Sequence, residues 1–428
     1  YRRQRQMCIR DRYGGGIFLL VYIILALTFG YTMIVAESAL GRMTRKSPVG
    51  AFGKFGKSKW LSFGGWINAI IPVLIVPYYS VIGGWVIKYL VEYVKGNTQN
   101  LATDGYFSEF ISNGVSTEIC FLVFALFTVG IIYAGVRNGV ERVSKFMMPV
   151  LVFLSIVITV YSVTRPGALE GVKYFLIPNP KNFSWMTVVA AMGQMFYSMS
   201  LAMGIMITYG SYTKDEVSIV KSVNQIEIFD TGIAILAGMM VVPAVYIFSG
   251  EAGTSQSGAG LMFVTLPKVF TQMTAGRFIG GLFFVLVFFA ALTSSVSVME
   301  AIVSMLIDRF HISRIKACLG VIIFSVALGI PCSLGNGVWS HITILGMDFL
   351  TFFDFISNSL LLPIVAFFTC LMIGWSTGAD YIIGEATKNG EAFKREKIYR
   401  VMIKYIAPVL LLIILVFYTL AQFNIIKF

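Results

Sequence analysis

The sequence has few charged residues for its 428 positions, only two histidines, and five cysteines without a pairing pattern. His311 and His341 are too few and too far apart for a metal site, and the cysteines lack the spacing of metal ligands or of a disulfide framework. There is no cleavable signal peptide with a small-residue cleavage site. No loop contains a metal motif or a nucleophile elbow, which argues against a membrane enzyme.

What the sequence has in abundance is apolar residues, which make up 57% of it and form recurring runs of about 20 residues. This pattern predicts an all-α, polytopic protein of the cell (plasma or inner) membrane. The net charge of +12 does not indicate nucleic-acid binding, because the Lys and Arg residues lie in short loops between spans. We predict about ten transmembrane helices, at residues 17–40, 62–94, 117–135, 145–163, 184–209, 223–248, 277–306, 316–334, 349–375 and 402–425.

The loops alternate in charge, which predicts the orientation. Basic loops face the cytoplasm in polytopic proteins. The loop at 96–117 has acids and no base, and the loop at 165–182 weakens the alternation without reversing it. The predicted cytoplasmic loops are 41–60, 136–145, 307–316 and 376–401.

Residues 1–12 conflict with this orientation, because they are strongly basic and would lie outside the cell. One interpretation is a non-native leader in place of a preceding span. The alternative is a genuine cytoplasmic tail, which would make one predicted span wrong.

The segment at 193–212 is apolar enough to cross a bilayer, yet its middle is small and polar. It contains Tyr197, Ser198, Ser200, Ala202 and Gly204. Such residues at mid-membrane favour a helix that opens there, which is tolerated only where the backbone lines a cavity or is buried in protein. A continuous helix that packs its small face on a neighbour is the alternative.

Two further polar groups lie inside predicted spans. Asp230 is an intramembrane acid, which marks an ion or proton site unless it is a protonated or helix-paired structural residue. Residues 290–295, Ala-Ala-Leu-Thr-Ser-Ser, offer hydroxyl ligands to a hard monovalent cation. The alternative is that these hydroxyls bond back to the preceding turn.

Other candidates lie at mid-span or at helix ends. Tyr78 and Tyr79 follow two prolines and either donate hydrogen bonds at depth or anchor the helix at the interface. Glu37 is expected to reach the interface or to pair with Arg42. Tyr212 and Asp308, at cytoplasmic span ends, are expected to pair with basic groups or to be solvated.

Several motifs in order resemble the neurotransmitter:sodium symporter family, especially its bacterial amino-acid transporters. The resemblance covers nearly all of 13–425. The residues that carry it are Tyr13-Gly-Gly-Gly-Ile-Phe18 through Glu37-Ser-Ala-Leu-Gly-Arg42, then Gly139 to Pro149, Gly193 to Tyr212, Phe263-Val-Thr-Leu-Pro267 and Phe288 to Ser295.

The resemblance implies a leucine-transporter fold of two inverted five-helix repeats, each with a broken first helix. It implies that this chain holds family helices 2 to 11, lacks helix 1 and is truncated, with residues 1–12 in the place of that helix. The rest of the first repeat is expected at 13–164, the second repeat at 184–375 and an extra helix at 402–425.

The resemblance also implies roles for individual residues. The implied substrate pocket contains Tyr79, which would bond the substrate carboxylate, with Ile75, Tyr197, Ser200, Met203, Ser294 and Val298. The first sodium site is implied at Ser198 and Asp230, and the second at the Ala290 carbonyl, Thr293 and Ser294. Implied gating or supporting residues are Glu37, Gln194, Tyr212, Asp308 and Asp354, with Asp348 as an alternative to the last.

The implied function is sodium-coupled uptake of a neutral amino acid, hydrophobic or aromatic, by alternating access across the bilayer. Asp230 stands where the family often has Asn, so a fixed negative charge is expected to replace chloride. Ala202 replaces a glycine of the family's helix break and narrows the space beside the substrate. The alternatives are a proton-coupled or uncoupled carrier and a non-transporting sensor or scaffold of the same fold. The oligomeric state is not predicted.

Overall fold

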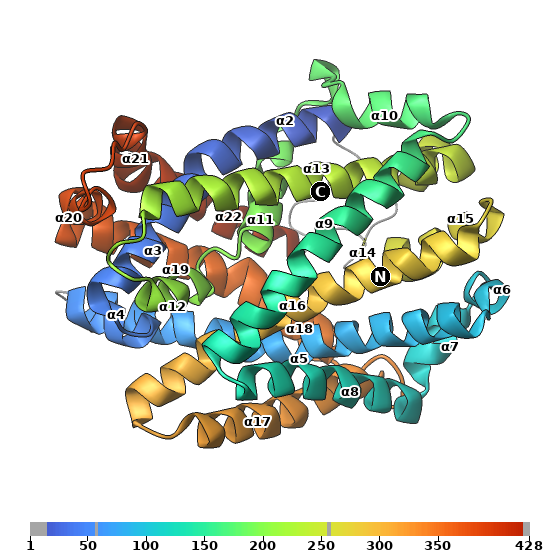
Figure 1. The fold of residues 1–428 in the computed structure, drawn as a ribbon, viewed down its shortest axis with the longest axis horizontal. Helices are drawn as coiled ribbons and strands as arrows, with labels where there is room; N and C mark the ends of the chain where they lie inside the picture. The colour runs from blue at the N-terminus through green and yellow to red at the C-terminus, as the bar shows by residue number, and fades with distance from the viewer. Residues whose placement is uncertain (1–14, 56–58, 255–257, 423–428) are drawn as a thin grey trace.

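The computed structural model describes residues 15–55, 59–254 and 258–422, and within these ranges the chain is helical, with one isolated bridge between Ile344 and Met347. The predictions about residues 1–12 therefore lie outside the described residues. The long helices run roughly side by side in an elongated bundle (Figure 1). The all-α fold class is confirmed.

Nine helices in the described ranges are long and apolar enough to cross a membrane. They correspond to nine of the ten predicted spans. The tenth, predicted at 184–209, is split into two shorter helices. The nine are Gly15–Thr44, Lys59–Lys95, Gly114–Tyr133, Asn138–Val163, Ile219–Phe248, Gly276–Phe310, Arg314–Leu334, Phe349–Thr377 and Glu396–Leu420.

Four of the nine spans contain more than one helical segment, because π-helical turns adjoin or interrupt their α-helices. The first half of the chain contains α2 (Gly15–Leu25), η1 (Ala26–Gly30), α3 (Tyr31–Thr44), α4 (Pro48–Phe55), α5 (Lys59–Lys95), α6 (Thr98–Leu101), α7 (Tyr106–Ser112), α8 (Gly114–Tyr133), η2 (Val136–Glu141), α9 (Arg142–Val163), α10 (Ala168–Leu176) and η3 (Pro180–Asn182).

The second half begins with the split span. It contains α11 (Trp185–Ser198), α12 (Ile205–Tyr212), α13 (Ile219–Thr254), α14 (Gly258–Gly260), η4 (Leu261–Thr265), α15 (Leu266–Gln272), α16 (Gly276–Phe310), α17 (Arg314–Leu334), α18 (Phe349–Asp354), η5 (Phe355–Leu361), α19 (Leu362–Leu371), η6 (Met372–Thr377), α20 (Ala379–Ala386), α21 (Glu396–Val401), η7 (Met402–Ile406) and α22 (Ala407–Gln422).

Glycines allow α3 and α12 to approach at backbone distance. A Cβ added at Gly41 would lie 2.1 Å from the Ile207 carbonyl oxygen, and one added at Gly210 would lie 2.4 Å from the Ser38 carbonyl oxygen. Small residues permit such close helix contacts in membranes, where dispersion and polar contacts hold helices together. This contact fixes α12, the second half of the split span, against α3.

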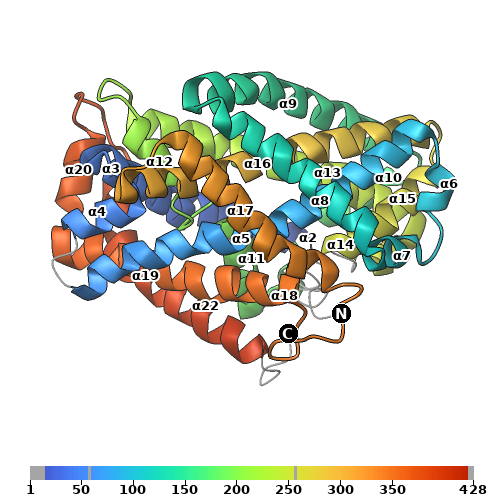
Figure 2. The same ribbon diagram turned by 90° about the horizontal axis from the view of Figure 1, so that it is seen from below.

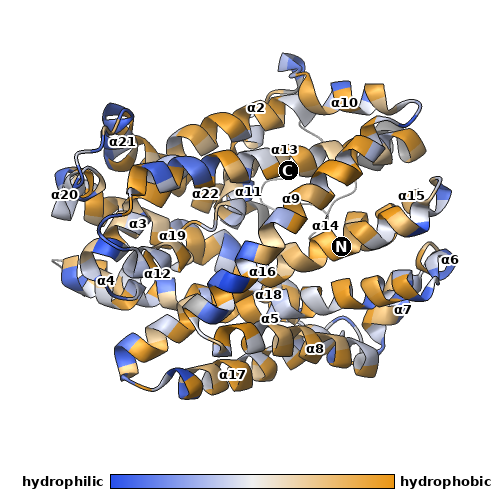
Figure 3. Cartoon of the chain, viewed as in Figure 1, coloured by the Kyte–Doolittle hydropathy of each residue, from blue (hydrophilic) through white to orange (hydrophobic). Residues whose placement is uncertain are grey.

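The polar ends of the bundle agree with the predicted orientation. Ser47 donates hydrogen bonds to Asp308, and Arg42 binds Glu385, so loops 41–60, 307–316 and 376–401 lie together. Helices α4, α20 and α21 lie at this end, whereas α6, α7, α10 and α15 lie at the other (Figures 1 and 2). Hydrophobic residues cover most of the length of α2 and α22, and hydrophilic residues gather at α20 and α21 (Figure 3). By the positive-inside rule, the end with α20 is cytoplasmic.

Candidate functional site

The split span is the centre of the candidate site. Helix α11 ends at Ser198 and α12 begins at Ile205, and three residues between them have positive φ: Ser200 (+53°), Ala202 (+58°) and Gly204 (+75°). A side chain in this left-handed region costs roughly 1–2 kcal/mol, so the surrounding structure must hold Ser200 and Ala202 in place. The prediction of an opened helix is confirmed, and the continuous-helix alternative is wrong.

Glu37 holds the opened segment from α3. Its Oε1 accepts a hydrogen bond of 2.8 Å from the backbone N–H of Ala202, and its side chain is fully buried. The expectation that Glu37 reaches the interface or pairs with Arg42 is wrong. Residues five apart lie on different faces of an α-helix, and Arg42 instead binds Glu385 at 2.5 Å.

Asp230 joins three helices at a half-buried position. Its Oδ1 accepts a hydrogen bond from Ser198 Oγ and its Oδ2 accepts one from the Tyr22 hydroxyl, both at 2.9 Å. The structure thus brings together Ser198 and Asp230, the predicted ligands of the first sodium site. Both of these donors are uncharged hydroxyls, so the carboxylate can still compensate a cation. Sequence reasoning missed Tyr22, whose signal was a tyrosine in the middle of an apolar run.

The predicted second ion site lies on α16. Thr293 Oγ1 donates to the carbonyl oxygens of Phe289 (3.0 Å) and Ala290 (3.1 Å), which is the back-bonding alternative stated above. The neighbouring Ser294 instead reaches across to α5, where its side chain is hydrogen-bonded to Tyr79. The structure therefore joins one predicted ion ligand to the predicted carboxylate-binding tyrosine.

The other predicted pocket residues lie on α5, α11 and α16 and in the opened segment 199–204. Ile75 on α5, Met203 in the opened segment and Val298 on α16 are buried, whereas Tyr197 at the end of α11 is 40% exposed. Ser200 is half-buried and adopts one of the three positive φ angles, and Gln194 is half-buried on α11. The substrate contacts of these residues and the supporting role of Gln194 stay predictions.

The two predicted cytoplasmic gating residues have different partners. The Tyr212 hydroxyl donates to Glu300 Oε1 at 3.0 Å, and Glu300, fully buried on α16, pairs with Arg314. Asp308 accepts hydrogen bonds from the Ser47 backbone N–H (3.0 Å) and hydroxyl (2.6 Å). Sequence reasoning missed Glu300, although an acid within an apolar run is the same signal that identified Asp230.

Asp354, the predicted extracellular gating residue, is linked through Asn358 to Tyr78. Asn358 Nδ2 donates to Asp354 Oδ1 at 2.8 Å and to the Tyr78 hydroxyl at 2.9 Å. The alternative residue, Asp348, caps the N-terminus of α18 by accepting a hydrogen bond from the Thr351 N–H at 2.9 Å. The gating role of Asp354, with Asp348 as the alternative, stays a prediction.

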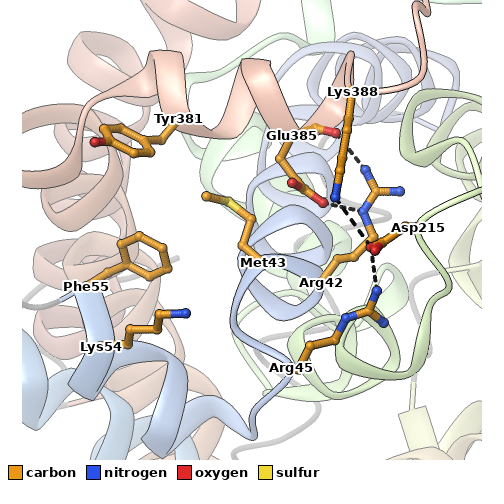
Figure 4. Close-up of a pocket in the computed structure, with 9 residues that line it drawn as sticks. All are labelled: Arg42, Met43, Arg45, Lys54, Phe55, Asp215, Tyr381, Glu385 and Lys388. Carbon is orange, nitrogen blue, oxygen red and sulfur yellow. Dashed lines mark hydrogen bonds and ion pairs between the residues drawn. The ribbon is translucent and has the colours of Figure 1, made fainter.

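Charged side chains gather around a pocket of about 350 Å³ at the cytoplasmic end (Figure 4). Arg42 Nη1 donates to the Val217 carbonyl at 2.5 Å in addition to binding Glu385. Arg45 pairs with Asp215 at 2.5 Å, and Lys388 approaches the same carboxylate at 3.6 Å. These contacts tie α3 and α20 to the loop between α12 and α13 at the cytoplasmic face.

The chain matches known proteins over nearly its whole length. Residues 5–106 and 108–428 match the model of the sodium:neurotransmitter symporter family. An uncharacterized sodium-dependent transporter of Bacillus subtilis, YhdH, is 34% identical over 412 residues, which is 94% of this chain and 89% of the relative. An uncharacterized sodium-dependent transporter of Haemophilus influenzae is 31% identical over 421 residues, covering 95% and 90% of the two chains.

A more distant relative and a solved structure also match most of the chain. The human sodium- and chloride-dependent GABA transporter 2 is 25% identical over 429 residues, covering 87% of this chain and 69% of that protein. The crystal structure of MhsT in complex with L-phenylalanine superposes with a TM-score of 0.86 at 32% identity, covering 96% of this chain and 93% of the other. The chain therefore belongs to the sodium:neurotransmitter symporter family and is a multi-pass, sodium-dependent membrane transporter, not an enzyme.

Proposed function

We propose that the protein couples the entry of Na⁺ to the uptake of a neutral, hydrophobic or aromatic amino acid. Two contacts carry this proposal: Ser198, directly before the opened segment 199–204, donates to Asp230, and Tyr79 on α5 is hydrogen-bonded to Ser294 on α16. Oxygen ligands and a phenol at mid-membrane suit a monovalent cation and a carboxylate. The structural relative MhsT was crystallised with L-phenylalanine, which supports an amino acid as substrate.

In this proposal, each end of the substrate has its own partners. The Tyr79 hydroxyl donates to the substrate carboxylate, and the helix ends that flank segment 199–204 stabilise its two charges. The apolar side chains of Ile75, Met203 and Val298 accept the substrate side chain. Ser198 and Asp230 supply ligands to one Na⁺, and the Ala290 carbonyl, Thr293 and Ser294 supply ligands to a second.

The driving force is the sodium gradient together with the membrane potential, which contributes about 2.3 kcal/mol per charge at 100 mV. Ion and substrate binding shift the population between outward-open and inward-open states. We propose that the two repeats, 13–164 and 184–375, move against each other in this change. Because Asp230 supplies a fixed negative charge at the first ion site, chloride is not required.

The test is uptake of radiolabelled L-phenylalanine, L-leucine and glycine into proteoliposomes that contain the purified chain. We expect an inward Na⁺ gradient to drive accumulation of the larger substrates, and replacement of Na⁺ by K⁺ to abolish it. Tyr79→Phe should abolish uptake, whereas Tyr133→Phe, an exposed tyrosine at the end of α8, should not. Accumulation driven equally by a proton gradient without Na⁺ would support the proton-coupled alternative, and absence of accumulation under every gradient would support the sensor or scaffold.

A further inference from the structure

A groove of about 1000 Å³ lies on α13 outside the candidate transport site. It is formed by α13, by the middle of the first span around η1, and by the segment 389–395 between α20 and α21. Asp230 and the other predicted ion ligands are not among the residues that line it. Ile228 and Leu27, which do line it, are 69% and 41% exposed, so the groove is open to the surroundings of the bundle.

The groove changes from polar to apolar along α13. Lys221 and Asn224 line its cytoplasmic end, and Ile228, Gly232 and Ile235 continue along the same helix face. At a helical rise of 1.5 Å per residue, Lys221 and Ile235 are about 21 Å apart along the axis. This length equals about half of a bilayer that is ~40–45 Å thick with its headgroups. The groove therefore spans one leaflet, with its polar end at headgroup depth.

The charges at the polar end leave two lysines for a ligand. Arg395 is already engaged, because its Nη1 lies 2.8 Å from Glu227 Oε1 and its guanidinium lies 4.5 Å from the centre of the Tyr31 ring. The carboxylate of Glu391 accepts a hydrogen bond from Ser218. By contrast, Lys221 and Lys394 are exposed, and neither ammonium group has an ion-pair partner within the described part of the chain.

We propose that this groove binds one anionic phospholipid of the cytoplasmic leaflet. Its phosphate lies between the Lys221 and Lys394 ammonium groups with the Asn224 amide as a further donor, and one acyl chain follows Ile228, Gly232 and Ile235. Basic pockets between helices on the cytoplasmic side are suited to anionic headgroups. The groove combines such a pocket with an apolar track of leaflet length, which a soluble phosphate would not use.

The headgroup half of the proposal is tested by native mass spectrometry of the purified full chain, titrated with phosphatidylglycerol or phosphatidylcholine in detergent. We expect one molecule of phosphatidylglycerol to bind preferentially. The double variant Lys221→Gln, Lys394→Gln should bind it about 30-fold more weakly, because each lysine near a membrane surface contributes a factor of roughly five. The matched control Lys59→Gln, Lys316→Gln removes the same charge from exposed cytoplasmic positions outside the groove and should bind as the unmodified chain does.

The acyl-chain half is tested with a substitution that fills the groove. A Cβ at Gly232 meets no atom within 4 Å, so this position has room for a side chain, and Gly232→Phe is chosen to fill the groove. The matched control is Gly130→Phe on α8, where a Cβ also meets no atom within 4 Å. We expect Gly232→Phe to weaken phosphatidylglycerol binding at least tenfold and Gly130→Phe to leave it unchanged.

Three results would overturn the proposal. Equal binding of phosphatidylcholine would show that the lysines do not select an anionic headgroup, and equal loss in the Lys59, Lys316 control would show a general effect of surface charge. Competition by soluble glycerol 3-phosphate, with no effect of Gly232→Phe, would identify a small phosphate ligand instead of a lipid. Because binding is measured without transport, the proposal can fail or succeed independently of the proposed function.

Discussion

The carboxylate of Glu37 accepts a hydrogen bond of 2.8 Å from the backbone N–H of Ala202, at the centre of the opened helix. An opened segment leaves peptide groups without helical partners, and an unsatisfied buried N–H costs about 1–3 kcal/mol. Glu37, on α3, thus supplies the hydrogen-bond acceptor that a backbone carbonyl oxygen would supply in a continuous helix. The same span contributes Tyr22 to Asp230, so the first described span supports both the backbone opening and the candidate ion site.

Removal of the Glu37 acceptor should destabilise the protein. We expect Glu37→Ala to lower the free energy of unfolding by about 1–3 kcal/mol and to reduce uptake at least tenfold, because the Ala202 N–H loses its partner. Glu37→Gln keeps an acceptor oxygen at the same position and should lose much less. Thermal unfolding in detergent and uptake in proteoliposomes measure both effects. If the Gln and Ala variants lost equal stability, the hydrogen bond to Ala202 would not be what Glu37 contributes.

Gly204 should not tolerate a side chain. Its φ is +75°, and a Cβ there would lie 2.5 Å from Asn68 Oδ1 and 2.9 Å from Pro48 Cγ. Gly204→Ala should therefore cost about 1–3 kcal/mol in unfolding free energy through backbone strain and overpacking. The double variant Gly204→Ala, Asn68→Ala should recover the part that comes from the Asn68 contact. Gly130→Ala, with no atom within 4 Å, is the control and should be neutral or stabilising.

The sequence predicted the spans well because each is a local property, an apolar run of bilayer length. It also predicted the helix opening, since Ser200, Ala202 and Gly204 are residues that do not belong in a lipid-facing span. The partners of the polar groups could not be predicted in this way. Tyr22 and Asp230 are 208 positions apart, and pairing across such distances depends on which helices pack together.

Glu37 shows how a local rule fails inside a membrane bundle. Its nearest basic neighbour, Arg42, belongs to a different helix face and binds Glu385, 343 positions away. Glu300 was overlooked although it is fully buried and pairs with Arg314. Glu37 binds the Ala202 N–H and Glu300 binds Arg314, and only the tertiary structure brings these groups together.

The ion pair between Asp104 and Lys268 joins the predicted extracellular loop 96–117 to α15, outside the membrane spans. The hydrogen bond and positive charge of Lys268 lower the pKa of the Asp104 carboxyl below its ordinary value. A carboxyl whose pKa is lower in the folded state stabilises that state above the ordinary value of about 3.9, and this stabilisation is lost as the pH falls through the lowered pKa. The contact should therefore persist unchanged between pH 8 and pH 5.

A carboxyl titration by nuclear magnetic resonance, with labelled aspartate, measures this pKa. We expect Lys268→Gln to move the Asp104 pKa up to its ordinary range. Lys173→Gln, which removes the partner of Glu170 in another predicted extracellular loop, 165–182, is the control and should leave Asp104 unchanged. An Asp104 pKa that is insensitive to Lys268→Gln would show that the two side chains do not pair in the membrane-embedded protein.

Asp230 should determine whether transport needs chloride. Its carboxylate is held by two uncharged hydroxyls, Ser198 and Tyr22, so it can offset the charge of a neighbouring Na⁺. We expect the unmodified protein to take up substrate equally in chloride and gluconate media. Asp230→Ser removes the fixed charge and should reduce uptake at least tenfold in gluconate, with recovery when chloride is restored. Asp230→Glu keeps the charge and should remain independent of chloride, whereas an Asp230→Ser variant with equal activity in both media would exclude this role for the carboxylate.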